Sequence, residues 1–178
     1  DIIEIAHQTG ADAIHPGYGY LAEKAEFAKT CERHHIRFIG PSVEVLDRLE
    51  DRHASLKFFQ EAGYKVVNFS KRVYSAGETA EVIAEAQQIG FPLILQAQFG
   101  QPRRSVWHCD QMDQLLHLLK RFTQKGGEFR FFLEKKIVNT HLIRVQIIGD
   151  HKGNITQLGE RDSSLEYRGR KIVEEMPA

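Results

Sequence analysis

Apolar residues in the first third of the chain alternate between helical spacing and short continuous runs. In chain order they predict a helix ending at Gly10, a strand over residues 11–15, a helix over 22–35, a strand over 36–39 and a helix capped by Ser42. The apolar face of that last helix is assigned to Val43, Val45, Leu46 and Leu49. This alternation favours a parallel α/β sheet with right-handed crossovers, whose ligands bind beyond the carboxyl ends of the strands.

The middle of the chain predicts further helices and a hairpin. A helix over about 52–62 precedes a capping box, Ser75 with Glu78, which is expected to open a helix reaching Ile89. Residues 91–108 read as strand, loop and strand. A helix then begins at Asp110, and we assign to the core Met112, Leu115, Leu116, Leu119 and Phe122.

Strand patterns return near the end, over residues 131–133, 142–148 and 155–158, with a turn through 149–154. The predicted fold class is therefore α/β followed by α+β. We expect three parts: residues 1–65 as the end of an α/β domain with linker helices, 66–135 as a central α+β module, and 136–178 as the start of an antiparallel β domain.

Composition narrows the class of protein. The 178 residues are 42% hydrophobic, and 24 basic residues balance 24 acidic ones, so no net charge attracts nucleic acid or a membrane surface. No apolar run reaches the roughly 20 residues of a membrane span, and the opening inside a helical pattern suggests a piece of a longer protein. Cys31 and Cys109 are isolated, which favours a reducing compartment, with the cytoplasm as the default.

The loop of the predicted hairpin carries unusual chemistry. A hairpin that closes over phosphates is expected to be rich in glycine, because bare backbone N–H groups must approach phosphate oxygens. Here the linker reads Phe99-Gly100-Gln101-Pro102-Arg103-Arg104, with one glycine and a proline that has no N–H. Arg103 and Arg104 are read as a solvated loop tip, with partial replacement of lost cations as the alternative. The location suits a nucleotide, but its usual chemistry is changed.

Several stretches together resemble biotin carboxylases, the ATP-grasp subunits or domains that carboxylate biotin. They occur in family order and at family spacing: Ile14 to Phe27 with its Pro16-Gly17-Tyr18-Gly19-Tyr20 turn, Phe38 to Ser42, Glu134-Lys135, Val145 to Ile147, Gly159 to Asp162, and Lys171 to Glu175. The resemblance covers nearly the whole chain and implies an ATP-grasp fold of biotin carboxylase type. In this family ATP and bicarbonate give carboxyphosphate, and its carbon dioxide passes to biotin.

The resemblance also assigns roles to single residues. Adenine recognition falls on the hinge of Glu134, Lys135 and Ile137, largely through backbone groups. The bicarbonate and biotin side falls on Lys171 and Arg168. An exposed hinge and a surface lysine are the alternative readings of Glu134-Lys135 and of Lys171, just as a plain tight turn is the alternative for Pro16 to Tyr20. The family's Mg²⁺ ligands are expected beyond Ala178, so no metal ligand is assigned within the chain.

Other positions depart from the family. Arg52 stands in place of a phosphate-facing lysine, Gln96 in place of the lysine that contacts ATP, and Gly100 is what remains of the glycine run. A neutral amide at Gln96 cannot offset triphosphate charge, an effect that can amount to several kcal/mol in phosphoryl transfer. The remaining departures are Leu142 and Gly169 for histidines, Arg144 for an acidic residue and Glu166 for a glutamine.

Because these substitutions concentrate at ligand positions, the leading hypothesis is a degenerate carboxylase component, non-catalytic or weakly active. The alternatives are an active biotin carboxylase and a regulatory module that binds adenine nucleotide without turnover. The implied ligands are ATP, Mg²⁺ and biotin as the acceptor. The implied partners are a biotin carboxyl carrier, a carboxyltransferase or a homologous biotin carboxylase, in a homo- or hetero-oligomer located in the cytoplasm or in an organelle that houses carboxylases.

Overall fold

The chain begins with a small parallel pair of strands and two helices. The computed structural model describes residues 1–98, 106–125, 129–150, 152–167 and 170–178. Helix α1 (Ile2–Thr9) ends at Gly10, whose φ of 68° is the left-handed conformation that glycine adopts without strain. Strand β1 (Ala13–Ile14) pairs in parallel with β2 (Arg37–Phe38), which confirms the predicted α/β start.

The helix predicted over residues 22–35 is divided in the structure. A 3₁₀ turn, η1 (Tyr20–Glu23), comes first, and α2 (Ala25–Arg33) follows it. Lys24 between them has extended backbone angles, so the helical hydrogen bonds start again at Ala25. At the other end His35 has a φ of 57°, which a continuing helix cannot accommodate.

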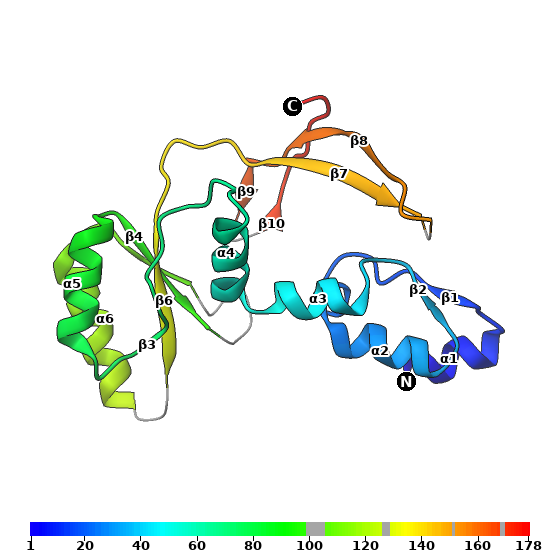
Figure 1. Ribbon diagram of the computed structural model, residues 1–178, viewed down its shortest axis with the longest axis horizontal. Helices are drawn as coiled ribbons and strands as arrows, with labels where there is room; N and C mark the ends of the chain where they lie inside the picture. The colour runs from blue at the N-terminus through cyan, green and yellow to red at the C-terminus, as the bar shows by residue number, and fades with distance from the viewer. Residues whose placement is uncertain (99–105, 126–128, 151, 168–169) are drawn as a thin grey trace.

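Helices α3 (Val43–Glu50) and α4 (Arg52–Glu61) connect this part to the rest of the chain (Figure 1). The Ser42 hydroxyl accepts a hydrogen bond from the Val45 N–H, so the predicted cap is confirmed. The predicted apolar face of α3 is wrong in part: only Leu46 is buried, whereas Val45 and Leu49 are exposed. The buried stripe is narrow because α3 packs a single side against Ala25 and Ala28 of α2.

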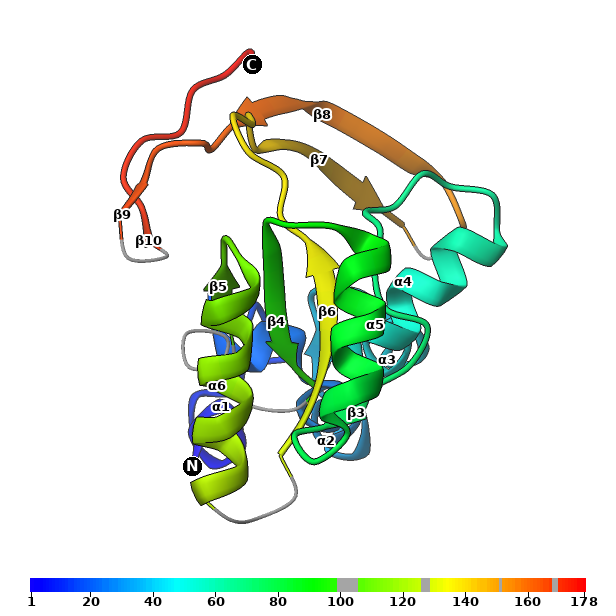
Figure 2. The same cartoon turned by 90° about the vertical axis from the view of Figure 1, so that its left-hand side faces the viewer.

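A four-stranded antiparallel sheet with two helices forms the central part. Its strands lie in the order β3-β6-β4-β5, and α5 and α6 cover one face (Figures 1 and 2). The bounds are β3 (Tyr74–Ser75), α5 (Thr79–Ile89), β4 (Leu93–Ala97), β5 (Val106–Cys109), α6 (Met112–Lys125) and β6 (Arg130–Lys135). The strands of the predicted hairpin are therefore confirmed, while its loop, including Gly100, lies outside the described residues.

The capping box is formed only in part. Glu78 accepts a hydrogen bond of 2.7 Å from the Ser75 N–H, yet α5 begins at Thr79 rather than next to Ser75. The start is later than predicted because Ser75 belongs to β3, where it pairs with Arg130.

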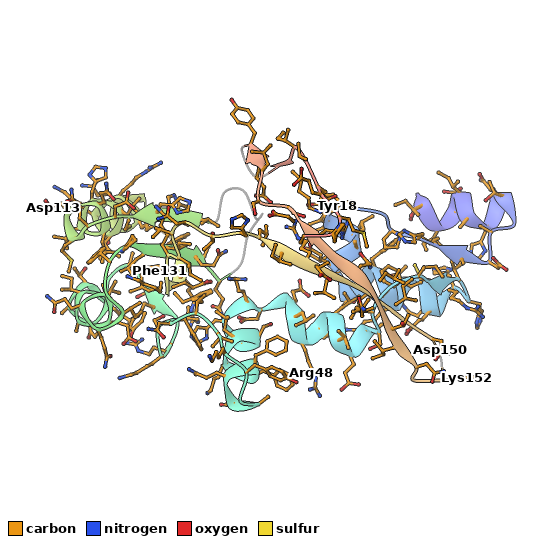
Figure 3. The ribbon with its side chains drawn as sticks, turned by 90° about the horizontal axis from the view of Figure 1, so that it is seen from above. Tyr18, Arg48, Asp113, Phe131, Asp150 and Lys152 are labelled. Atoms are coloured by element: carbon orange, nitrogen blue, oxygen red, sulfur yellow. The ribbon has the colours of Figure 1, made fainter. Side chains whose placement is uncertain are left out.

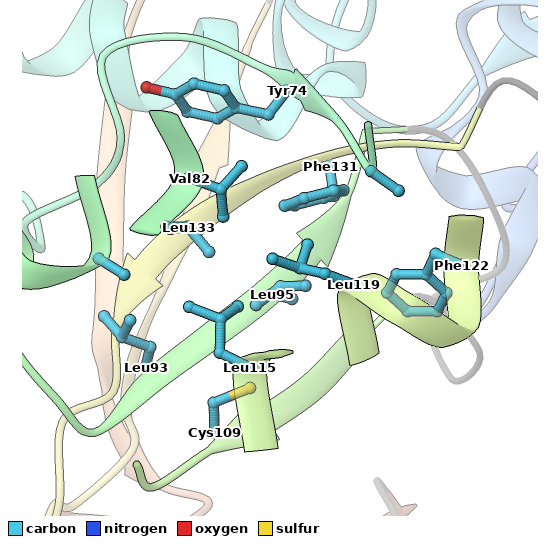
Figure 4. Close-up of a cluster of buried hydrophobic side chains, with 12 residues drawn as sticks. Tyr74, Val82, Leu93, Leu95, Cys109, Leu115, Leu119, Phe122, Phe131 and Leu133 are labelled. Atoms are coloured by element: carbon cyan, nitrogen blue, oxygen red, sulfur yellow. The ribbon is translucent and has the colours of Figure 1, made fainter. Parts of the chain in front are cut away.

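The main hydrophobic core lies between the sheet and its two helices (Figure 4). Leu115, Leu119 and Phe122 of α6 are buried there, as predicted, against Leu95, Phe131 and Leu133 of the sheet among others. Leu116 is 39% exposed, which contradicts its assignment to the core. Its neighbour Leu118 packs against the core instead, because the face of α6 turned to the sheet is centred on Leu115 and Leu119.

An extended antiparallel ribbon ends the chain. Strands β7 (Ile143–Gly149) and β8 (Ile155–Asp162) pair with a register shift between Val145 and Ile147. The short strands β9 (Glu166–Tyr167) and β10 (Arg170–Lys171) form a second pair beside them. Among the helices that the structure describes, none has both the length and the apolar character needed to cross a bilayer.

Candidate functional site

The face of the central sheet opposite its helices carries two of the predicted site residues. Along β4, Leu93, Leu95 and Ala97 are buried, so the alternating residue Gln96 belongs to the other face. Gln96 lies directly opposite Phe132 of β6, and Ile94 lies opposite Glu134. Gln96 and Glu134 therefore share the face that α5 and α6 leave uncovered.

Arg52, from the first turn of α4, binds Glu134 on that face. Its Nε donates a 2.6 Å hydrogen bond to one carboxylate oxygen, and an NH2 group donates a 2.8 Å bond to the other. The Glu134 side chain is 5% exposed and the Arg52 side chain is 57% exposed. The hydrogen bonds that Arg52 donates to Glu134 raise the pKa of the Arg52 guanidinium above its ordinary value. The Arg52 cation is thus already paired with a hinge carboxylate.

The two residues beside Arg52 also bind the central part. Asp51 caps α4 through its contact with the Ala54 N–H, and its second oxygen accepts a 3.0 Å hydrogen bond from the Gln98 side-chain amide. The His53 imidazole lies 2.9 Å from the Ser70 carbonyl oxygen and makes an edge contact with Phe132. Three successive residues of α4 and its cap therefore hold three different segments of the central part.

The Lys135 side chain is occupied by backbone carbonyls. Its Nζ donates to the Gly90 oxygen at 3.0 Å and to the Phe91 oxygen at 2.6 Å, where α5 ends and β4 approaches. Its own N–H donates to the Asn68 carbonyl at 2.7 Å. The groups that remain for a ligand are backbone groups after the end of β6, near Ile137, which is 60% exposed. This arrangement is compatible with recognition of adenine by backbone groups.

No cation occupies the position of Gln96. Its amide makes one long contact, 3.5 Å to the Ala97 carbonyl, and its carbonyl and amide carry no net charge. Within the described parts of the chain, Arg52 binds this face and its charge is offset by Glu134. By strand alternation Arg130 of β6 and His108 of β5 belong to the same face, so the charge missing from it is the one at position 96, where a triphosphate requires a cation.

Lys171 belongs to a different cluster, on the C-terminal strands. One oxygen of Glu174 accepts from the Lys171 Nζ at 3.0 Å, from the Ser163 hydroxyl at 2.9 Å, and contacts an Arg161 nitrogen at 3.5 Å. The hydrogen bond from Lys171, followed by that from Ser163, lowers the pKa of the Glu174 carboxyl. A carboxylate that was not assigned from the sequence therefore fixes the position of the Lys171 ammonium.

The glycine-containing turn near the N-terminus meets this C-terminal cluster. The Lys171 Nζ lies 4.8 Å from the centre of the Tyr18 ring, a distance suited to a cation–π contact. Tyr18 is 86% exposed, and Figure 3 shows it beside the C-terminal strands. Gly17 and Gly19 of the turn have φ of 63° and 144°, as expected for glycines at these positions.

The structure brings some of the predicted site residues together and leaves others undescribed. Arg52, Gln96 and Glu134 share one face, with Lys135 and Ile137 at the end of β6, whereas Lys171 lies on β10. Arg168 and Gly100 lie outside the described residues. Sequence reasoning missed Gln98, His53 and Glu174; only Glu174, three residues after Lys171, had a local signal. In the described parts of the chain no group of three His, Cys, Asp or Glu side chains can hold a metal ion.

Comparison with known proteins assigns the class. Residues 1–46 match the family described as biotin carboxylase, N-terminal domain, and residues 51–178 match carbamoyl-phosphate synthase L chain, ATP binding domain. Together with the sheet and helices described above, these matches define an ATP-grasp protein. The chain belongs to the biotin carboxylase family within that class.

Its relatives include pyruvate carboxylases and biotin carboxylases. It is 38% identical over 99% of its length to pyruvate carboxylase 1 of Caenorhabditis elegans and to biotin carboxylase of Halalkalibacterium halodurans. It superposes on a Campylobacter jejuni biotin carboxylase in complex with β,γ-ATP with a TM-score of 0.83, 35% identity and 99% coverage. The chain spans 15% of the first relative and 40% of the other two proteins.

Proposed function

We propose that this chain is the ATP-grasp portion of a biotin carboxylase homologue whose nucleotide site is impaired, and that it serves a carboxylase assembly as a non-catalytic or weakly active component. The observation that carries the proposal is the bidentate bond from Arg52 to Glu134. This bond occupies Arg52, the cation that stands in place of the family's phosphate-facing lysine. Gln96, in place of the second lysine, supplies no positive charge.

Nucleotide binding at this face depends on positive charge. Phosphoryl transfer is promoted by cations that offset the charge of the triphosphate, and each such contact contributes several kcal/mol. Freeing Arg52 for a phosphate would leave the Glu134 carboxylate, 5% exposed, without its partner. Since an unpaired buried charge is costly, the pair opposes recruitment of Arg52 to ATP. Gln96 therefore weakens nucleotide binding because it lacks a charge, and Arg52 weakens it because its charge is already paired with Glu134.

We assign roles to the residues as follows. Lys135 and Ile137 would present backbone groups to adenine, Arg52, Gln96 and Gly100 would face the phosphates, and Glu134 would hold the hinge. Lys171 and Arg168 would lie on the bicarbonate and biotin side. When bound with Mg²⁺, ATP would supply the phosphoryl group that bicarbonate accepts. Residues 1–65, 66–135 and 136–178 are taken as the end of the N-terminal domain, the lid and the start of the C-terminal domain.

A second function, active carboxylation of biotin, is favoured by one observation. Lys171 is retained, and Glu174 and Tyr18 fix its ammonium, as a working bicarbonate site would require. In that case residues outside this chain compensate for Gln96, and a biotin carboxyl carrier and a carboxyltransferase are the expected partners. Its location would be that of the carboxylase, the cytoplasm or an organelle.

Calorimetric titration of the full-length protein with Mg-ATP and with ADP tests the proposal. We expect no binding, or binding weaker than millimolar, and no biotin-dependent ATP cleavage at saturating bicarbonate and magnesium. Micromolar binding with bicarbonate-dependent cleavage would replace the proposal with the active carboxylase. Micromolar binding without cleavage would instead indicate a nucleotide-binding regulatory module. A biotin carboxylase with an intact lysine at the position of Gln96 serves as the positive control.

A further inference from the structure

Two arginines lie directly opposite each other on the C-terminal ribbon. Arg144 of β7 is the cross-strand partner of Arg161 of β8 in the antiparallel register. Residues in such a pair share one face of the ribbon with their Cβ atoms about 5 Å apart, and like charges there are destabilising. The family resemblance implies an acidic residue at position 144, where this chain carries arginine.

Neighbouring carboxylates neutralise the two arginines only in part. Arg144 contacts Glu166 at 3.7 Å, and Arg161 contacts Glu174 at 3.5 Å while also donating to the Gln146 side chain at 3.1 Å. Glu174 is shared with Lys171. Among the described side chains, three cations therefore face two carboxylates, and the cluster carries one excess positive charge.

Each arginine also keeps an unused donor. The NH1 group of Arg144 and the Nε of Arg161 are shielded from solvent and have no hydrogen-bond partner in the described structure. The rest of each side chain is accessible, with exposed fractions of 33% and 31%. Unsatisfied donors of this kind are rare in folded proteins, because a shielded N–H without an acceptor is unfavourable. A hydrogen-bond acceptor with one negative charge would satisfy the two orphan donors and neutralise the excess charge.

We infer that Arg144 and Arg161 form a binding site for a small oxyanion of the carboxylate type. A planar carboxylate accepts paired hydrogen bonds from guanidinium groups and matches the excess charge of one. The donors of this site are the two arginines, and Lys171, to which the family resemblance assigns bicarbonate, contributes charge through the shared Glu174. The existence of the site does not depend on whether the protein cleaves ATP.

The test is thermal unfolding of the full-length protein in increasing concentrations of sodium acetate, with sodium chloride at matched ionic strength as the baseline. Specific binding stabilises the native state as the logarithm of ligand concentration above the dissociation constant. We expect acetate to raise Tm by about 2–4 °C relative to chloride. Inorganic phosphate and bicarbonate are titrated in parallel, to distinguish a carboxylate site from a general anion site and from the Lys171 site.

Three variants and a control decide the outcome. Arg144→Glu introduces an acidic residue and is expected to abolish the acetate shift. Arg144→Lys keeps the charge but loses the planar guanidinium, and it is expected to reduce the shift at least about threefold. Lys171→Gln, which removes the excess charge but neither orphan donor, is expected to weaken the acetate shift, and Arg33→Gln, an exposed arginine of α2, to leave it in place. Loss of the shift in Lys171→Gln with its retention in Arg144→Glu would assign the anion to Lys171 and overturn the inference. Equal shifts in acetate and chloride would overturn it too, because no carboxylate would then bind the two donors specifically.

Discussion

Arg52 and Glu134 are 82 positions apart in the sequence and are joined by two hydrogen bonds of 2.6 and 2.8 Å. Helix and strand meet there through a charge pair, one member of which is buried and the other largely in water. The pair fixes α4 to the end of β6 and also sets the electrostatics of the proposed nucleotide face. The first two predictions separate these structural and electrostatic consequences.

Replacing Arg52 by Gln is expected to destabilise the fold. The change leaves the Glu134 carboxylate shielded and unpaired, and we expect a loss of about 1–3 kcal/mol in the free energy of unfolding. Chemical denaturation measures it. Arg33→Gln is the matched control, since Arg33 pairs with Glu26 where both side chains are mostly exposed, and its cost should stay below about 1 kcal/mol. The double variant Arg52→Gln with Glu134→Gln should cost less than the two single changes together; strict additivity would mean that the pair is not coupled.

Replacing Gln96 by Lys is expected to strengthen nucleotide binding. A lysine here adds a cation to the face that Gln96 shares with Glu134, and we expect Mg-ATP to bind at least about tenfold more tightly, equivalent to about 1.4 kcal/mol. Calorimetry measures the change. Gln96→Met, similar in size and uncharged, should leave binding as it is. If Gln96→Lys has no effect, the missing charge at position 96 does not limit the site.

Adjacent leucines of α6 are expected to differ sharply in their contribution to stability. Leu115→Ala removes a fully buried side chain and should cost about 2–5 kcal/mol. Leu116→Ala removes a side chain that is 39% exposed and should cost about 1 kcal/mol or less. Both changes introduce alanine into the same helix, so helix propensity cancels in the comparison. Similar losses measured by urea unfolding would place Leu116 in the core after all.

Acid is expected to remove a contribution of Asp162 to stability. Hydrogen bonds from His141 and then Ser164 lower the pKa of the Asp162 carboxyl to about 2, from an ordinary value of 3.8. A lowered carboxyl pKa stabilises the native state above the unfolded-state value, and the contribution is lost as pH falls from about 4 to about 2. Asp162→Asn, whose side-chain oxygen still accepts a hydrogen bond, should flatten Tm against pH in this window. If Tm depends on pH in the same way in the unchanged protein and in Asp162→Asn, Asp162 is not the source of the acid destabilisation.

The cysteines are expected to be unreactive in the folded protein. Both are buried and free, and burial raises the pKa of the Cys109 thiol to about 11 and that of Cys31 above its ordinary value. At pH 8 about one Cys109 thiol in a thousand is ionised, so modification should be at least 10²-fold slower than that of a free thiol. Cys31→Ser isolates the Cys109 signal, and denaturant supplies the fast reference rate. Rapid labelling without denaturant would contradict the burial of Cys109.

Local signals in the sequence predicted most of the element order. Gly10 and Ser42 end and begin helices because their chemistry acts within a few residues, and the two strands around the 99–105 linker follow from β-favouring runs. Leu116 and Val45 were misassigned because helical spacing gives the width of an apolar face only approximately, and the neighbouring helix or sheet decides which residues lie at its margin.

The candidate site was less predictable, because its contacts join distant positions. Arg52 was expected to face phosphate, and nothing near it in the sequence indicates Glu134 as its partner. The bond from Asp51 to Gln98 spans 47 positions and depends on the packing of α4 against the sheet. The link between Tyr18 and Lys171 connects the two ends of the chain. Such pairings follow from the fold and leave no periodic trace in the sequence.

Three consecutive residues at the start of α4 each contact a different segment of the central part. The contacts are Asp51 with Gln98, Arg52 with Glu134, and His53 with Ser70. Because the three residues are consecutive, their contacts fix the orientation of the central sheet about the start of α4 at three separate points. The contact that holds this orientation through Arg52 is also the one that offsets its charge on the open face of the sheet. The orientation of the sheet and the charge of that face therefore depend on the same pair of side chains.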